Sequence, residues 1–396
     1  MKIRAITAAV VLLAGLAGCG GQPASHNVTL RMTTWSNNEA HVKLFTEIAA
    51  SYKQTHPDVT VRFDALPFES YTTTVTTQIA GGNPPDLAWV LENAAPDFVS
   101  SGALAPLDGA IENESDLTEA ATKLWRQDGK LIAYPFSTSP FGVFVNTDLI
   151  KQLPEPWTWE SAMAAAARSK GLVVRDFDYK NWDNLATIFQ GWGAEAWSAD
   201  GKTCGFNQPA MVDAMTFIHK SIFTDEAMPG PGTSADFFAG EAAMTVTQIS
   251  RASLLKDAKF RWTLVPLPAG PKGEYSVIGQ GGVGVLKKGK QADAAKDFLT
   301  FFTNAGNSAK LAQFFPPPRK SQLTAASLAK ANPLLEPEQL QDVVINGIET
   351  GVVKPSHTSN AELSQTVRSA LDPLWKPDAD VPAVLNGVCT AIQPLL

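Results

Sequence analysis

Three glycines in the second half of the chain have a spacing that can bind a dinucleotide. Gly279, Gly281 and Gly284 satisfy the pattern GxGxxG, in which glycine lets a phosphate group approach the backbone. That chemistry needs a strand before the glycines and a helix directly after them. Here "VGVLKK" continues as a strand, and the next helix begins only near Gln291. The glycines therefore predict close approach of the backbone to a ligand, or a crossing between two lobes.

Other catalytic and metal-binding patterns are missing from the sequence. It has no GxxxxGK[ST] for phosphate and no GxSxG for a nucleophilic serine, although a nucleophile assembled from distant residues stays open. The five histidines are scattered without the spacing of metal ligands, so we expect neither a metal nor a cofactor. With 39 acidic residues, the carboxylate pair of a glycosidase can be imagined in many places, so that signal has no specificity.

Tryptophan is the residue type that best indicates a ligand. The chain has ten tryptophans and five tyrosines. Aromatic faces pack on the C–H faces of sugar rings, while Asp, Glu, Asn and Arg bind the hydroxyl groups. Most tryptophans serve only packing. Trp35 and Trp182 are the candidates for a sugar site, because each adjoins Asn, Asp or Glu in a predicted loop or helix start.

The three cysteines fall into two groups. Cys19 follows the short apolar run from Ala5 to Leu16, which has the form of a secretory signal and is too short to span a bilayer. Leu16-Ala17-Gly18-Cys19 resembles a bacterial lipobox, which predicts a signal peptide over 1–18 and a lipidated Cys19 with a flexible tether over 19–27; the alternative is a chance cysteine. Cys204 and Cys389 have no metal-like spacing and form either a disulfide or two buried thiols.

Length and charge narrow the class of protein. A chain of 396 residues favours two domains or lobes. Residues 1–18 contain two of the 32 basic residues and none of the 39 acidic ones, so the remainder has 30 basic against 39 acidic residues, a net charge of −9. A surface for nucleic acid or anionic membrane is not expected.

The first lobe of the chain alternates strand and helix patterns. Residues 28–35 alternate apolar and polar, residues 39–54 have helical spacing at Val42, Phe45, Ile48, Ala49 and Tyr52, and residues 59–66 and 86–90 read as strands with a helix through Ile79 between them. This order predicts an α/β fold with a parallel sheet. Ligands of such sheets bind at the carboxyl ends of the strands, which singles out residues 35–39 and 90–93.

Later segments continue the mixture of strands and helices. Residues 130–150 are strand-like, and Thr158 can cap the helix that follows, whose first turn carries Glu160. Helices dominate the last third, interrupted by "FFPPPRKSQ" at 314–322.

Together these pieces resemble the bacterial extracellular solute-binding proteins of carbohydrate ABC transporters, the family to which maltose-binding protein belongs. The resemblance covers about residues 19–322 and is carried, in the order of the family, by "LAGCGG", "VTLRMTTWSNNE", "IAGGNPPDLAWV", "SGALAPLD", "DGKLIAYPFSTSPFGVFVNTDLI", "PWTWESA", "FFAGEAAMTV", "GGVGVLKKGKQADAAKDFLTFFT" and "PPPRKSQ".

The resemblance implies a two-lobed α/β fold of the periplasmic-binding-protein type (type II), with several hinge crossings and a ligand cleft between the lobes. The N-terminal lobe would comprise 28–137 and 283–322, and the C-terminal lobe 140–279 and 323–396, which places Cys204 and Cys389 in one lobe and favours their disulfide. Such a receptor acts as a monomer. Anchored outside the membrane by its Cys19 lipid, it closes on its solute and docks on a permease, while a separate ATPase supplies the energy.

The resemblance also implies a set of ligand-binding positions. They are Trp35, Asn37 and Glu39; Glu92 and Asn93; Ser137 and Ser139; Asn181, Trp182 and Asp183; Ser250 and Arg251; Gln280, Gly281 and Gly282; and Arg319.

Two departures from maltose-binding protein widen the range of solutes. Ser139 stands where that protein has a carboxylate, and Ser250 and Arg251 stand where it has an aromatic residue. A receptor for a glycerophosphodiester, another phosphorylated solute or an amino sugar is therefore an alternative to a sugar receptor. A surface glycoside hydrolase and a purely structural lipoprotein are more remote alternatives.

Overall fold

A computed structural model describes residues 27–174, 179, 181–233 and 235–396. The predicted signal peptide, the lipidated Cys19 and the tether up to residue 26 lie outside the described residues. Within the described part of the chain, no helix combines the length and the apolar character needed to cross a membrane.

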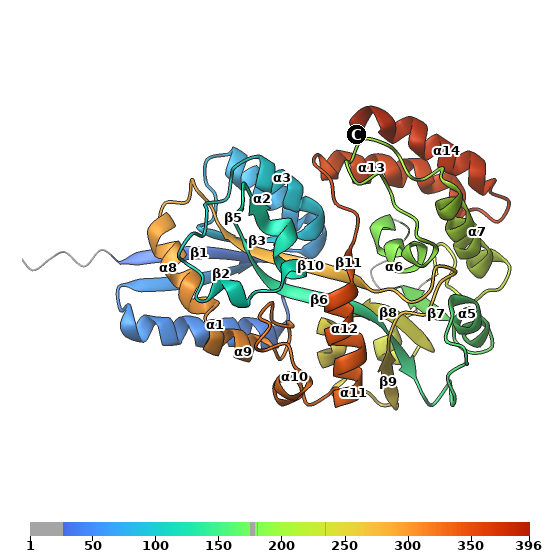
Figure 1. Ribbon diagram of the computed structural model, residues 1–396, viewed down its shortest axis with the longest axis horizontal. Helices are drawn as coiled ribbons and strands as arrows, with labels where there is room; N and C mark the ends of the chain where they lie inside the picture. Colours follow the sequence, from blue (N-terminus) through green and yellow to red (C-terminus); the bar gives the residue numbers. More distant parts are fainter. Residues whose placement is uncertain (1–26, 175–178, 180, 234) are drawn as a thin grey trace, which may run out of the picture.

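The described residues form two lobes that share one continuous sheet (Figure 1). In order across the sheet, the main strands are β2 (Val59–Ala65), β1 (Val28–Thr34), β3 (Leu87–Leu91), β10 (Val277–Val285), β6 (Tyr134–Asn146), β8 (Met244–Gln248) and β7 (Leu172–Val174). Two further strands belong to the sheet: β11 (Val352–Val353) pairs with β10, and β9 (Trp262–Val265) pairs with β6.

The first lobe confirms the predicted alternation of strand and helix. Strand β1 pairs in parallel with both β2 and β3. The connections are α1 (Glu39–Thr55) and α2 (Tyr71–Ala80), each a crossover helix of the kind that parallel strands require. The carboxyl ends of β1 and β3 therefore meet at one edge of the sheet, as the sequence predicted.

Helix α1 begins and ends where its sequence directs. The Asn38 side chain caps it by accepting a hydrogen bond from the Ala40 N–H at 2.9 Å, and the helix ends before Pro57. Phe45, Ile48, Ala49 and Tyr52 are buried as predicted, whereas Val42 is half-buried. The inward positions in its place are His41 and Leu44, so the buried stripe is rotated slightly from the predicted one.

His41 is a buried histidine that forms no ion pair with any other residue described by the structure. Its ring lies between Phe314 and Phe315, with centroids 4.4 and 4.9 Å away, and its Nδ1 is 2.8 Å from Ser36 Oγ. Burial lowers the pKa of His41 to about 4. The unfolded chain takes up this proton near pH 6.5, and the folded chain does so only near pH 4. The free energy of unfolding therefore falls as the pH drops between these values.

Replacing His41 by glutamine should remove this contribution. The wild type should lose about 2 kcal/mol more than the variant between pH 7 and pH 4.5, since each pKa unit corresponds to about 1.4 kcal/mol. Urea unfolding at several pH values measures the two slopes. Equal slopes for both proteins would show that His41 does not carry the pH dependence.

The second lobe is built on the other half of β6. This half pairs with β8 and β9, and β8 pairs in parallel with β7. Thr158 caps α5 (Trp159–Ala167) as predicted, in a capping box with Ser161. The other large helices of this lobe are α7 (Pro209–Phe223), α13 (Asn360–Leu371) and α14 (Val381–Ile392).

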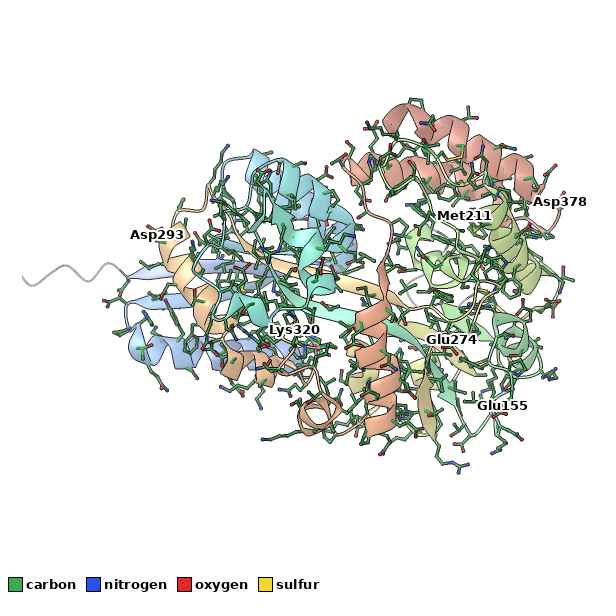
Figure 2. The ribbon with its side chains drawn as sticks, viewed as in Figure 1. Glu155, Met211, Glu274, Asp293, Lys320 and Asp378 are labelled. Atoms are coloured by element: carbon green, nitrogen blue, oxygen red, sulfur yellow. A yellow bond between two sulfur atoms is a disulfide. The ribbon has the colours of Figure 1, made fainter. Side chains whose placement is uncertain are left out.

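Strands β6 and β10 cross from one lobe to the other. One hydrophobic core draws its residues from 30–136 and 283–315, and the cores on the other side draw theirs from 141–277 and 323–392. Figure 2 shows the side chains of both lobes, with Asp293 labelled in the first lobe and Met211 in the second. The exact lobe boundaries at 137–140, 279–283 and 322–323 stay a prediction.

The glycine-rich segment is a strand, as predicted. Gly279, Gly281 and Gly284 all lie in β10, and the following helix, α8 (Ala292–Phe302), begins after Gln291. The surroundings of a dinucleotide fingerprint, with a helix directly after the glycines, are not present at this segment.

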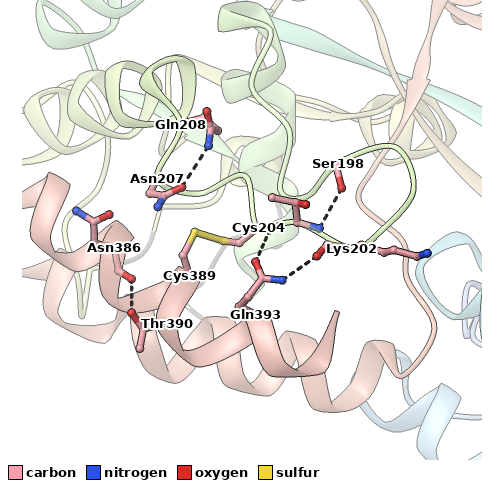
Figure 3. The surroundings of a disulfide bond; sticks show 10 residues. Ser198, Lys202, Cys204, Asn207, Gln208, Asn386, Cys389, Thr390 and Gln393 are labelled. Carbon is pink, nitrogen blue, oxygen red and sulfur yellow. Dashed lines mark hydrogen bonds between the residues drawn. A yellow bond between two sulfur atoms is a disulfide. The ribbon is translucent and has the colours of Figure 1, made fainter.

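Cys204 and Cys389 form the predicted disulfide, which joins the segment before α7 to α14 (Figure 3). Gln393 reinforces the connection, because its Oε1 accepts from the Cys204 N–H at 3.1 Å and its Nε2 donates to the Lys202 carbonyl at 2.7 Å. The bridge therefore ties the C-terminal helix to the body of the second lobe.

Candidate functional site

Trp35 lies at the carboxyl end of β1, held by a cluster of aromatic rings. Its ring meets those of Tyr71 and Trp89 edge to face, with centroids 5.3 and 4.6 Å apart. Tyr71 is fixed in turn, because its hydroxyl donates to the Trp89 carbonyl at 2.9 Å. Trp35 itself is only half-buried. A rigid aromatic ring that keeps part of its surface accessible is the type of group that packs on a sugar ring.

The crossing strands place small residues beside Trp35. Ser137 of β6 is the register partner of Gly281 in β10, and Ser139 is the partner of Gly279. A Cβ atom at position 281 would lie 2.9 Å from the Trp35 ring and 3.2 Å from Phe136. A glycine is therefore needed at 281 to let Trp35 lie against the sheet.

Alanine at position 281 should displace Trp35. We expect solute binding about tenfold weaker and a loss of roughly 1–3 kcal/mol in the free energy of unfolding, the usual cost of overpacking. Calorimetric titration and urea unfolding measure the two effects. The control is Gly230→Ala, because a Cβ atom there meets nothing within 4 Å. If Gly281→Ala bound the solute with unchanged affinity, Trp35 would not be part of the binding site.

Groups of the first lobe cover the opposite face of β10. Successive strand residues point to opposite faces, so Gln280 and Gly282 face away from Trp35. The Gln280 Nε2 donates to the Ala120 carbonyl at 3.1 Å, and a Cβ atom at 282 would lie 2.8 Å from the Trp125 ring. The predicted ligand contacts of Gln280 and Gly282 are not supported by this geometry.

In the second lobe, the residues that follow β8 contact the crossing strand β6. The Ser250 N–H donates to Ser139 Oγ at 3.3 Å, at the start of the 3-10 helix η8 (Ile249–Leu255). A Cβ atom at position 279 would collide with the Gln248 side chain, which therefore lies on the Trp35 face of β10. Ser139 and Ser250 are therefore in hydrogen-bond contact, and the Ser139 side chain is 1% exposed. Arg251 follows as a half-buried residue.

Lys354 joins predicted residues of the two lobes. Its Nζ lies 3.3 Å from Glu92 Oε1, at the end of β3, and 2.9 Å from Asp183 Oδ2, in the 3-10 helix η5 (Trp182–Leu185) of the second lobe. It also donates to Asn184 Oδ1 at 3.1 Å and lies 6.0 Å from the centroid of the Phe141 ring. We call Glu92, Lys354 and Asp183 the charge triad.

The charge triad is largely removed from solvent. The side chains of Lys354, Glu92 and Asp183 are 11%, 6% and 19% exposed. Burial by itself lowers the pKa of Lys354, but the carboxylates of Asp183 and Glu92 outweigh it, and the net pKa is raised. The raised pKa favours the charged form of the lysine at neutral pH. Two carboxylates and one ammonium give the triad a net charge of −1.

A second polar connection links the lobes beside the charge triad. Asp97 belongs to α3 (Ala95–Ser100) of the first lobe, and its two carboxylate oxygens accept from the backbone N–H groups of Ser359 and Asn360 at 2.7 and 3.2 Å. These donors stand at the start of α13 in the second lobe, where a carboxylate is also favoured by the helix dipole.

Residues 35–309 match the family described as bacterial extracellular solute-binding protein, which is more than half of the chain. The chain belongs to this family. As a solute-binding protein of this kind it is extracytoplasmic, as predicted, and the family consists of binding proteins rather than enzymes.

Relatives and solved structures agree with the family. An uncharacterised lipoprotein of Streptomyces antibioticus is 26% identical over 339 residues, covering 79% of this solute-binding protein and 75% of the relative. The fold matches an ABC substrate-binding protein from Listeria monocytogenes in complex with cycloalternan (TM-score 0.80, 22% identity, 93% and 98% of the two chains). It also matches UgpB from Mycobacterium tuberculosis in complex with glycerophosphocholine (TM-score 0.79, 17% identity, 93% and 98%).

Two predicted positions of this solute-binding protein are used for packing. Trp182 is 4% exposed and meets Phe206 and Trp197 edge to face in the second-lobe core. Arg319 is 1% exposed, and its guanidinium donates to the carbonyls of Glu112 and Thr303 at 2.9 and 3.0 Å. The predicted ligand contact of Arg319 is therefore not supported.

Asn37 and Glu39 are exposed at the start of α1. They line a surface hollow of about 530 Å³ together with Val42, Lys43, Thr46, Glu47 and Ala65. This hollow lies along the outer side of α1 and does not include Trp35 or the charge triad. Asn93, which follows Glu92, and Asn181, two residues before Asp183, are both half-buried.

Lys354 is the residue that sequence reasoning missed. It directly follows β11, a two-residue strand whose pairing with β10 at Val277 and Ile278 brings it to the lobe junction. The only local signal is a lysine after two β-branched residues and before a proline, which is too common a pattern to indicate a site.

Proposed function

We propose that this protein is the substrate-binding lipoprotein of an ABC importer, which captures a sugar or oligosaccharide between its lobes and delivers it to a membrane permease. The observation that carries the proposal is the lobe junction, where the half-buried ring of Trp35 follows β1 of the first lobe and Lys354 joins the carboxylates of Glu92 and Asp183 from the two lobes. An aromatic face together with carboxylate acceptors suits a polyhydroxylated ring.

A solute should favour hinge closure, because its proposed contacts are divided between the two lobes. Trp35 and Glu92 belong to the first lobe and Asp183 to the second, so a solute can contact all three only when the lobes are close together. The solute therefore favours the closed form by its difference in affinity for the two forms. A permease that docks on the closed form then receives only loaded receptor, and the ATPase acts indirectly through the permease.

A thermal-shift panel tests the proposal. Maltose, maltotetraose, cycloalternan and other neutral saccharides are added to the purified protein, and calorimetry follows for those that raise the melting temperature. A solute that binds only the folded chain must stabilise it, by about 2.7 kcal/mol at 100 times its dissociation constant. If no saccharide in a broad panel shifted the melting temperature, the receptor proposal would fail.

A receptor for a glycerophosphodiester is the second candidate, favoured by the fold match to the glycerophosphocholine complex. It would rely on arginine, and Arg319 is committed to backbone carbonyls. Loss of binding in Arg251→Ala for anionic solutes only would favour this candidate. A hydrolase would cleave the bound saccharide, whereas the proposed receptor releases it unmodified, so an assay for hydrolysis products distinguishes the two.

Anchoring is tested separately by Cys19→Ala. The variant should be released from the membrane as a folded monomer with unchanged solute affinity, while uptake in cells is lost, because the receptor is no longer held near the permease. Membrane fractionation, calorimetry and an uptake assay measure the three quantities. Weaker binding by the released protein would contradict a purely tethering role for Cys19.

A further inference from the structure

The two carboxylates of the charge triad have hydrogen-bond acceptors that the protein itself does not use. The Lys354 ammonium donates hydrogen bonds to Asp183 Oδ2 at 2.9 Å and Asn184 Oδ1 at 3.1 Å, and its Nζ forms an ion pair with Glu92 Oε1 at 3.3 Å. Each carboxylate gives one oxygen to the lysine. Among the described residues, the second oxygens, Glu92 Oε2 and Asp183 Oδ1, have no protein donor. Two ionised acceptors, one from each lobe, are therefore left for a ligand.

The triad is also unbalanced in charge. Burying a lone ammonium or a lone carboxylate is very unfavourable, and a cation between two carboxylates is the arrangement that lets all three stay ionised. The remaining charge of −1 lies in a largely desolvated place, where charge acts more strongly than in water. It repels a phosphate or carboxylate and does not repel a hydroxyl group or an ammonium.

We propose that Lys354 is a specificity-determining residue, which holds Glu92 and Asp183 as paired acceptors for the hydroxyl or amino groups of a neutral or amine-bearing saccharide and so excludes anionic solutes. This inference rests on the proposed function, and it decides between neutral or amine-bearing saccharides and anionic solutes as ligands of the site. Lys354 acts through the two carboxylates and positions them.

The test compares dissociation constants for three charge classes by calorimetry. The probes are maltotetraose and cycloalternan (neutral), acarbose (amine-bearing), and maltose 1-phosphate and glycerophosphoglycerol (anionic). For the wild type we expect the neutral or amine-bearing probe to bind at least tenfold more tightly than any anionic one. An anionic probe that binds best would overturn the inference.

Two variants move the charge in opposite directions. Lys354→Met keeps the apolar stem and makes the triad more negative, so affinity for the neutral probe should fall tenfold or more while the preference for acarbose over it rises. Asp183→Asn keeps the shape and removes the net charge, so the exclusion of anionic probes should relax about tenfold. Lys288→Met, an exposed lysine, is the matched control and should change no ratio.

The ratios separate this role from a structural one. A residue that merely supports the fold would weaken all probes alike, so unchanged ratios in both variants would overturn the inference while leaving the receptor function intact. Asp183→Asn keeps the test decisive if Lys354→Met does not fold. If the wild type bound none of the saccharides, the proposed function would fail and this inference with it.

Discussion

Trp35→Ala is expected to weaken saccharide binding by about 30- to 1000-fold, the largest effect of any single substitution at the lobe junction. A rigid aromatic anchor at the centre of a binding surface commonly contributes about 2–4 kcal/mol. Trp35 has this character, because Tyr71 and Trp89 hold its ring edge to face and Gly281 lets it lie on the crossing strand. Calorimetric titration with the saccharide that gives the greatest thermal shift measures the loss.

A second tryptophan controls for general destabilisation. Trp262 of β9 is half-buried against Phe144 in the second lobe, with ring centroids 5.8 Å apart. Trp262→Ala should lower the melting temperature without changing the dissociation constant by more than about threefold. If both variants lost binding equally, or if Trp35→Ala kept full affinity, Trp35 would not be the sugar platform.

Removing the disulfide is expected to give the largest loss of stability. The cross-link joins residues 185 positions apart, so it restricts the unfolded chain strongly, and the free energy of unfolding of Cys204→Ala/Cys389→Ala should fall by about 3–5 kcal/mol. Both cysteines are buried, which adds the cost of two small cavities. Urea unfolding with intact and substituted protein measures the difference.

Reduction supplies the internal control for this prediction. Wild type treated with a thiol reductant should approach the stability of the double variant, while the variant should be insensitive to reductant. Solute affinity should stay nearly unchanged in both, because the bridge lies between α7 and α14 and not at the lobe junction. A double variant as stable as the oxidised wild type would show that the bridge contributes nothing.

The elements that follow local rules were predictable from the sequence. Strands β1 to β3 and their helices follow alternation and helical spacing, Thr158 caps α5, and the glycines continue as β10, because each of these signals acts over a few neighbouring residues. The disulfide needed the resemblance to a family as well, since spacing alone left two buried thiols open.

The parts of the site that depend on tertiary pairing were not predictable in the same way. Glu92 and Asp183 were expected from the resemblance, but Lys354, which joins them, is brought there only by the pairing of β11 with β10. Position in a motif also does not fix which way a side chain faces. Gln280 and Gly281 are neighbours on opposite faces of β10, and Arg319 is turned into the first lobe to bind carbonyls.

A crystal structure of the protein with the saccharide that stabilises it most would show directly where the solute binds. We expect the sugar ring to pack on Trp35, and the saccharide to be unmodified. One of its hydroxyl groups should donate to Glu92 of the first lobe and another to Asp183 of the second. A saccharide bound away from the lobe junction, or contacted by residues of one lobe only, would contradict this expectation.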